Sequence, residues 1–113
     1  MRDTAALFCG VALACASCAG EATAATHVVV IDRMAYEPAR LELITGDVVE
    51  WRNEDAVPHT ATSLPGGFDV MLAPNEVKRS TIAARGTFDV TCRFHPGMAM
   101  QLEVRSARSE PES

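Results

Sequence analysis

The chain has 113 residues, of which 10 are basic and 15 acidic, so its formal net charge is −5 at pH 7. This length is enough for one small domain. The acidic balance argues against nucleic acid as a partner, because phosphate binding requires a basic patch.

Residues 1–25 have the features of a secretory signal. Arg2 supplies a thin positive start, residues 5–16 form a short apolar run rich in Ala, Leu and Val, and a small-x-small cleavage pattern follows. The run is too short to cross a bilayer as a helix, so we expect no membrane span. Export would place the protein in the periplasm, and lipid attachment at Cys15 or Cys18 stays open as an alternative.

The cysteines bear on the chemistry of the exported chain. Three of the four cysteines, Cys9, Cys15 and Cys18, lie inside the expected signal. Its removal leaves Cys92 without a disulfide partner, and a solitary cysteine in an exported protein calls for another role. Metal ligation provides one.

The region 26–105 has the pattern of one all-β domain. Runs of β-branched or alternating residues of strand length are separated by Gly, Asn, Asp and Pro turns. No segment shows sustained helical periodicity. We expect strands at 27–32, 40–43, 48–53, 76–82, 86–92 and 100–104. Short strands at this spacing predict a sandwich or barrel, and residues 106–113 read as a disordered tail.

The expected core is modest because aromatic residues make up only 5% of the chain. Its main side chains should be Tyr36, Trp51, Phe68 and Phe88, with Val49 on the same strand face as Trp51. The polar residues around Trp51 read as a solvated face: Glu50, Arg52, Glu54 and Asp55. We also expect His27 to be solvated, and Met34 and Met71 to be ordinary core or surface residues.

An unusual cluster of side chains follows the strand that ends at Cys92. Cys92, His95 and Met98 lie within seven residues, and His59 lies upstream in a turn-like setting after a proline. One Cys, two His and one Met form the ligand set of a mononuclear blue-copper site. Thiolate and thioether suit Cu(I) and imidazole suits either oxidation state, so a fixed compromise geometry favours one-electron transfer.

Other interpretations of this cluster are weaker. Cys, His and Met are often ordinary core or surface residues, but three such accidents would have to coincide on one loop. A structural zinc site would normally use four Cys or His ligands, and Met is a poor zinc ligand. A Cys–His hydrolase would need an orienting acid and an oxyanion-hole motif, which the loop lacks. A periplasmic copper carrier or store without redox partners remains open.

Four segments carry a resemblance to a known family: residues 34–38, 46–51, 57–59 and 86–98. They match the early strands, the first-histidine turn and the ligand loop of the cupredoxins. The chain is most similar to the amicyanin group, with plastocyanins and pseudoazurins as wider relatives, and the likeness covers roughly residues 28–104.

This resemblance implies a Greek-key β-sandwich with one type 1 copper ion near one end. The ligands would be His59, Cys92, His95 and Met98, and the protein would be a monomeric electron carrier rather than an enzyme. A periplasmic dehydrogenase would donate electrons and a c-type cytochrome would accept them.

The chain departs from the family pattern at several positions. Arg93 and Phe94 stand where many relatives have threonine and proline. Thr60 stands where asparagine is common, and its hydroxyl could tie the two ligand loops together by a hydrogen bond. Met100 is an alternative axial ligand, as in pseudoazurin-like loops. The direct run after Pro96 into the last strand favours Met98.

Overall fold

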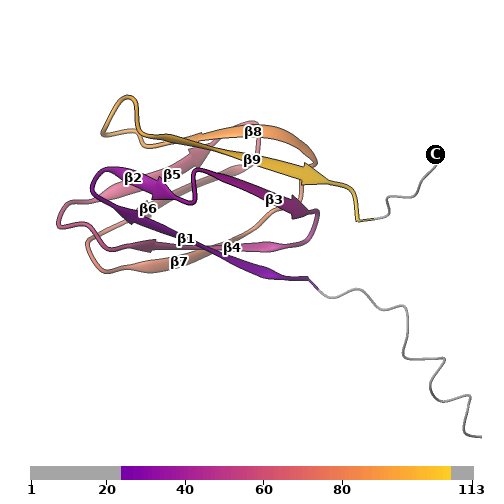
Figure 1. Ribbon diagram of the computed structural model, residues 1–113, viewed down its shortest axis with the longest axis horizontal. Helices are drawn as coiled ribbons and strands as arrows, with labels where there is room; N and C mark the ends of the chain where they lie inside the picture. Colours follow the sequence, from indigo (N-terminus) through magenta and orange to yellow (C-terminus); the bar gives the residue numbers. More distant parts are fainter. Residues whose placement is uncertain (1–23, 108–113) are drawn as a thin grey trace, which may run out of the picture.

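Two β-sheets build residues 24–107, the part of the chain that this computed structural model describes (Figure 1). The four-stranded sheet has the order β2-β1-β4-β7 and the five-stranded sheet the order β3-β9-β8-β5-β6. The strands are β1 (Thr26–Asp32), β2 (Ala35–Glu37), β3 (Arg40–Ile44), β4 (Val48–Asn53), β5 (His59–Ser63), β6 (Phe68–Leu72), β7 (Val77–Thr81), β8 (Gly86–Thr91) and β9 (Ala99–Arg105). The all-β class predicted from the sequence is confirmed.

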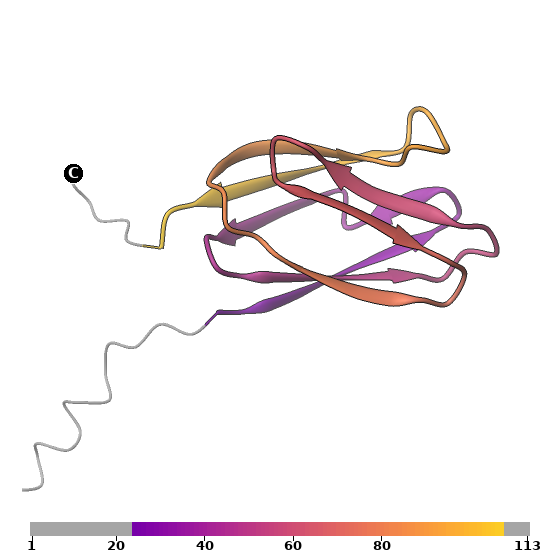
Figure 2. The same cartoon turned by 180° about the vertical axis from the view of Figure 1, so that it is seen from behind.

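The two sheets face each other as a sandwich. β1 and β4 run parallel, as do β3 and β9, and the other neighbouring strands are antiparallel. Seen from behind, the edge strands β6 and β7 close one side of the sandwich (Figure 2). Within the described residues there is no helix of the length and apolar character that a membrane crossing requires.

The register of the strands places the core between the sheets. Val49 and Trp51 are both fully buried, as their alternation on β4 predicts. The Trp51 ring lies 6.4 Å from Tyr36 and 5.7 Å from Phe68 between centroids. Its Nε1–H donates a hydrogen bond to Ser80 Oγ at 3.0 Å, which satisfies the one polar atom of this side chain. Phe68 and Phe88 are only partly buried and pack at the margin of the core.

The sequence predictions found six strands and missed three: β2, β5 and β6. β2 has only three residues, and β5 is a run of His, Thr, Ala and Ser without a large apolar side chain. β5 is nevertheless buried because β6 and β8 flank it on either side in the sheet. Neighbouring strands rather than local hydrophobicity therefore define it. The expected signal and tail lie almost entirely outside the described residues.

Two loops that carry the predicted metal ligands meet at one end of the sandwich. The turn between β4 and β5 leads into His59, and the loop between β8 and β9 carries residues 92–98 at the left of Figure 1. The first and last described residues lie at the opposite end (Figure 1). The fold therefore separates the termini from the ligand loops.

The opposite end is held by Asp47, in the turn before β4. Its carboxylate accepts hydrogen bonds from Ala25 N–H at 3.0 Å and Ile44 N–H at 3.1 Å, and it faces His27 Nε2 at 2.9 Å. The expectation that His27 is simply solvated is therefore wrong. Burial alone would raise the pKa of Asp47, but these hydrogen bonds outweigh it and hold the pKa below its ordinary value.

Replacing Asp47 by asparagine is expected to lower the free energy of unfolding at pH 7 by about 1–3 kcal/mol. Since the pKa of Asp47 is lower in the folded protein than in the unfolded chain, its contribution is complete above the unfolded value of about 4. That contribution is lost as the pH falls through the folded pKa. Urea unfolding of both proteins at pH 7 and pH 3 should show a smaller difference at pH 3, and an unchanged difference would contradict the assignment.

Candidate metal centre

Local chain geometry brings three predicted ligands to one point. His59 is the first residue of β5, Cys92 directly follows β8, and His95 lies in the loop before β9. This loop turns back where Met98 N–H donates to the His95 carbonyl at 3.1 Å. Gly97 has a φ of +94° there, a conformation that glycine adopts without steric cost.

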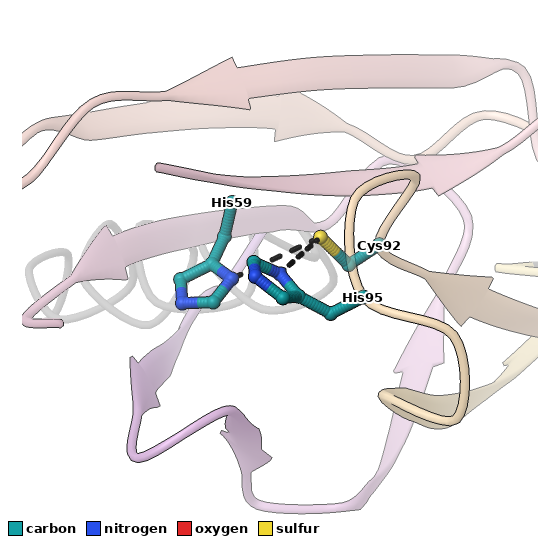
Figure 3. A group of neighbouring side chains, drawn as sticks. All are labelled: His59, Cys92 and His95. Atoms are coloured by element: carbon teal, nitrogen blue, oxygen red, sulfur yellow. Dashed lines mark hydrogen bonds between the residues drawn. The ribbon is translucent and has the colours of Figure 1, made fainter. Parts of the chain in front are cut away.

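The three side chains form one group (Figure 3). The Cys92 sulfur lies 3.8 Å from His59 Nδ1 and 3.6 Å from His95 Nδ1, and the two imidazole centroids are 4.7 Å apart. All three ligand atoms lie within 4.8 Å of one another. His59 is fully buried, Cys92 is buried and His95 is partly exposed. One sulfur and two imidazole nitrogens therefore converge at a site closed on the His59 side.

The Cys92 sulfur is surrounded by hydrogen-bond donors. Burial alone would raise its pKa, but hydrogen bonds to the sulfur, led by those of the Thr60 N–H and the His95 ring, outweigh burial and lower the pKa of this thiol to about 6. The Thr60 nitrogen is 3.3 Å from the sulfur. The side chain is therefore a thiolate at neutral pH, which is the form that binds metals.

The second ring nitrogen of His59 is held by Asp55. His59 Nε2 lies 2.7 Å from Asp55 Oδ2, which also accepts a hydrogen bond from Met34 N–H at 3.0 Å. Because an ionised carboxylate only accepts hydrogen bonds, Nε2 carries the proton and Nδ1 presents its lone pair toward Cys92. The expectation that Asp55 belongs to a solvated face is wrong, and the same holds for Glu50, which is buried between Arg52 and Arg79.

Asn53 sets the shape of the turn that carries Asp55. It is almost fully buried, and its amide nitrogen donates to the carbonyls of Val57 at 2.9 Å and Leu72 at 3.2 Å. Its amide oxygen accepts from Asp55 N–H at 2.9 Å. The sequence analysis placed Asn53 only at the end of the expected strand 48–53 and gave it no role at the site. The sequence did contain a signal for this turn, because Asn53 followed by Asp55, four residues before His59, is typical of an Asx turn.

Thr60 connects the two ligand-bearing segments, as its position predicts. Its hydroxyl accepts a hydrogen bond from Arg93 N–H at 2.9 Å, and its own N–H reaches the Cys92 sulfur. Its carbonyl accepts a hydrogen bond from the buried Tyr36 hydroxyl at 2.6 Å. Burial raises the pKa of Tyr36, with the nearby Cys92 charge adding to the effect, so Tyr36 stays a neutral donor.

The donor set fits copper. A thiolate and two imidazoles are the three strong ligands of a type 1 site, and a buried, hydrogen-bonded sulfur is the environment that such a site requires. Comparison with known proteins agrees, because residues 5–104 match the family of cupredoxin-like domains. The chain is a cupredoxin.

The cupredoxin is 34% identical over 92 residues to amicyanin of Paracoccus denitrificans, covering 76% of this chain and 70% of the relative. It also resembles the solved Cu(I) form of an amicyanin variant with methionine replaced by alanine (29% identity, 75% of this chain and 87% of that one, TM-score 0.65). A purple cupredoxin from Nitrosopumilus maritimus matches with 25% identity, a TM-score of 0.62, and coverage of 69% of this chain and 98% of the relative.

These likenesses make the chain an amicyanin-like cupredoxin with a type 1 copper ion as its cofactor. The resemblance to amicyanins predicted from the sequence is confirmed. The site is consistent with a copper electron carrier and not with an enzyme.

Met98 and Met100 occupy different settings in this cupredoxin. Both are buried. Met100 lies on β9 opposite Val90 and shares the inward face of that strand with Leu102 and Val104. Met98 lies in the ligand loop itself, three residues after His95. Met100 therefore has a place on a core strand, whereas Met98 lies on the same loop as His95.

Replacing Phe94 by proline should lower the reduction potential of the cupredoxin. Proline has no N–H, so the sulfur loses one of its two backbone hydrogen bonds. The sulfur carries more negative charge in the reduced state, so this bond stabilises that state more. A difference of about 1 kcal/mol corresponds to roughly 40 mV for a one-electron couple. Cyclic voltammetry would measure the shift.

The control is Phe94→Ala, which removes the exposed ring but keeps the N–H. The alanine variant should remain close to the original potential. Equal shifts in the proline and alanine variants would assign the effect to the ring instead.

Proposed function

We propose that this cupredoxin carries single electrons between redox proteins, with its copper held by His59, Cys92, His95 and Met98. The observation that supports this most directly is that the Cys92 sulfur and one ring nitrogen of each histidine lie within 4.8 Å of one another. When bound, copper supplies the one-electron change between Cu(II) and Cu(I).

The protein's part is to hold the ligands in place and exclude water. His59 is fixed by Asp55, the Cys92 sulfur by two backbone N–H groups, and the Cys92–Arg93 peptide by Thr60. Ligands that are fixed in advance need little rearrangement when the charge of the site changes. Such an environment favours electron transfer over bond-making chemistry.

His95 is the proposed edge where electrons enter and leave. Of the two imidazoles it is the partly exposed one, and Phe94 packs against it edge to face with ring centroids 6.4 Å apart. Phe94 and Val57 expose 46% and 40% of their surfaces near the ligand loops. A small apolar surface of this kind suits brief docking, which is typical of redox encounters.

The likeness to amicyanins supports a more specific version of the proposal. The protein would be exported to the periplasm and act as a monomer. It would accept electrons from a periplasmic dehydrogenase and deliver them to a c-type cytochrome.

The test is a visible absorption and electron paramagnetic resonance spectrum of the protein loaded with Cu(II). We expect an intense thiolate-to-copper band and a small copper hyperfine splitting, both bleached reversibly by a reductant. The same spectra of Met98→Leu and Met100→Leu would decide the axial ligand, because only the ligand's replacement should change them. A pale spectrum with ordinary copper parameters would reject the electron carrier and favour a copper carrier or store.

A second variant tests the route of the electrons. His95→Ala should open the site to solvent and slow electron self-exchange in the copper-loaded protein. A native self-exchange rate in this variant would contradict the proposed route through His95.

A further inference from the structure

A closed ring of hydrogen bonds lies beside the ligand loop and reaches a strand that carries no ligand. Arg93 N–H donates to Thr60 Oγ1 at 2.9 Å, and Thr60 Oγ1 lies 2.9 Å from Thr62 Oγ1. Thr62 Oγ1 donates to Asp69 Oδ1 of β6 at 2.8 Å. The other carboxylate oxygen of Asp69 accepts a hydrogen bond from the Arg93 guanidinium, which closes the ring.

The direction of every hydrogen bond in the ring is determined. The Thr62 hydroxyl and the Arg93 guanidinium hold the pKa of Asp69 below its ordinary value, so its carboxylate is ionised and only accepts. The Thr62 hydroxyl therefore donates its only proton to the Asp69 carboxylate. It must then accept from Thr60, and Thr60 in turn accepts from Arg93 N–H.

The ring acts on the peptide that follows the proposed thiolate ligand. The donating N–H of Arg93 belongs to the Cys92–Arg93 peptide, and Thr60 directly follows His59 in the chain. Thr60 also donates its N–H to the Cys92 sulfur. A displacement of the Thr60 hydroxyl would therefore disturb contacts on both ligand-bearing segments.

The ion pair between Arg93 and Asp69 would not by itself hold the ligand loop in place. Arg93 and Asp69 expose 55% and 35% of their side chains, and ion pairs at such exposure contribute little. Consecutive hydroxyl hydrogen bonds with one fixed direction strengthen one another, and the carboxylate at their end fixes that direction. The contribution of Asp69 thus passes through Thr62 and Thr60 to a nearly fully buried hydroxyl group.

We propose that Thr62 and Asp69 are positioning residues, which complete this ring and thereby hold the ligand loop of the copper site at Arg93. The inference rests on the proposed function in one respect, the role of Cys92 as a ligand. It assigns a role to two residues of β5 and β6 that contribute no ligand atom. It also assigns a role to the Arg93 side chain, which makes the second contact to Asp69.

The test compares Thr62→Val and Asp69→Asn with Thr62→Ser in the full chain. The first measurement is amide hydrogen exchange at Arg93 by NMR, on metal-free protein and on the diamagnetic Cu(I) form. Loss of a hydrogen bond worth about 1.4 kcal/mol corresponds to about tenfold faster exchange. We expect about that increase in Thr62→Val and Asp69→Asn, exchange within about twofold of the original in Thr62→Ser, and no additivity in the Thr62→Val/Asp69→Asn double variant.

The matched controls are Thr87→Val and Asp89→Asn on β8. They make the same chemical changes on exposed residues of the same sheet, outside the ring. A second readout is the thiolate-to-copper absorption band of the Cu(II) form, which should shift in the ring variants and stay unchanged in the controls and in Thr62→Ser.

The inference would be overturned if Thr62→Val and Asp69→Asn showed the same amide exchange at Arg93 and the same absorption band as the control variants. A Thr62→Ser variant that behaves like Thr62→Val would also overturn it, because the hydroxyl would then have no role. Absence of the thiolate band in the unaltered protein would instead reject the proposed function. The exchange data on metal-free protein would still decide whether the ring positions Arg93.

Discussion

Replacing Cys92 by serine is expected to abolish the intense visible band of the copper-loaded protein and to weaken copper binding severely. The thiol of Cys92 has its pKa lowered to about 6 and is ionised at neutral pH. A serine hydroxyl stays protonated and lacks the soft sulfur that Cu(I) prefers. Titration with Cu(I) and Cu(II) against a chromophoric chelator, together with the absorption spectrum, would measure both effects.

The matched control is Met71→Leu, which removes an exposed sulfur from β6, a strand that carries none of the proposed ligands. This variant should keep the band and the affinity. Circular dichroism would verify that Cys92→Ser remains folded. A folded Cys92→Ser protein with an undiminished band would show that another group is the copper chromophore.

The ligands could be predicted from the sequence because most of them are close together in the chain. Cys92, His95 and Met98 lie on one loop, and a soft sulfur beside an imidazole limits the possible metals. Only His59 had to be brought in from a distant segment. The structure places its Nδ1 3.8 Å from the Cys92 sulfur.

The residues that support the ligands could not be predicted in the same way. Asp69 reaches Arg93 only because β5 pairs with both β6 and β8. That pairing depends on β5, a strand of small polar residues without the apolar alternation that predicts strands. A carboxylate in a charged stretch reads as solvated unless its acceptor geometry is known, which is why Asp55 was assigned to a solvated face.

The role of Asp55 leads to the second large expected effect, a 10- to 100-fold loss of copper affinity in Asp55→Ala, roughly the usual cost of removing a partner of a metal-binding histidine. The carboxylate fixes the His59 ring by the 2.7 Å contact to Nε2 and so aims Nδ1 at the site. Without it the buried ring can rotate or adopt the other tautomer. Competition with a chromophoric copper chelator would measure the affinity.

Two further variants separate orientation from charge. Glu54→Ala removes the same charge from the neighbouring, exposed position and should leave the affinity unchanged. Asp55→Asn keeps an oxygen that can accept from Nε2–H but lacks the negative charge, so its affinity should lie between those of the original protein and Asp55→Ala. If Glu54→Ala weakens binding as much as Asp55→Ala, the effect is one of net charge and the orienting role of Asp55 is wrong. If Asp55→Asn restores most of the affinity, the acceptor geometry at Nε2 is what the copper site requires from this turn.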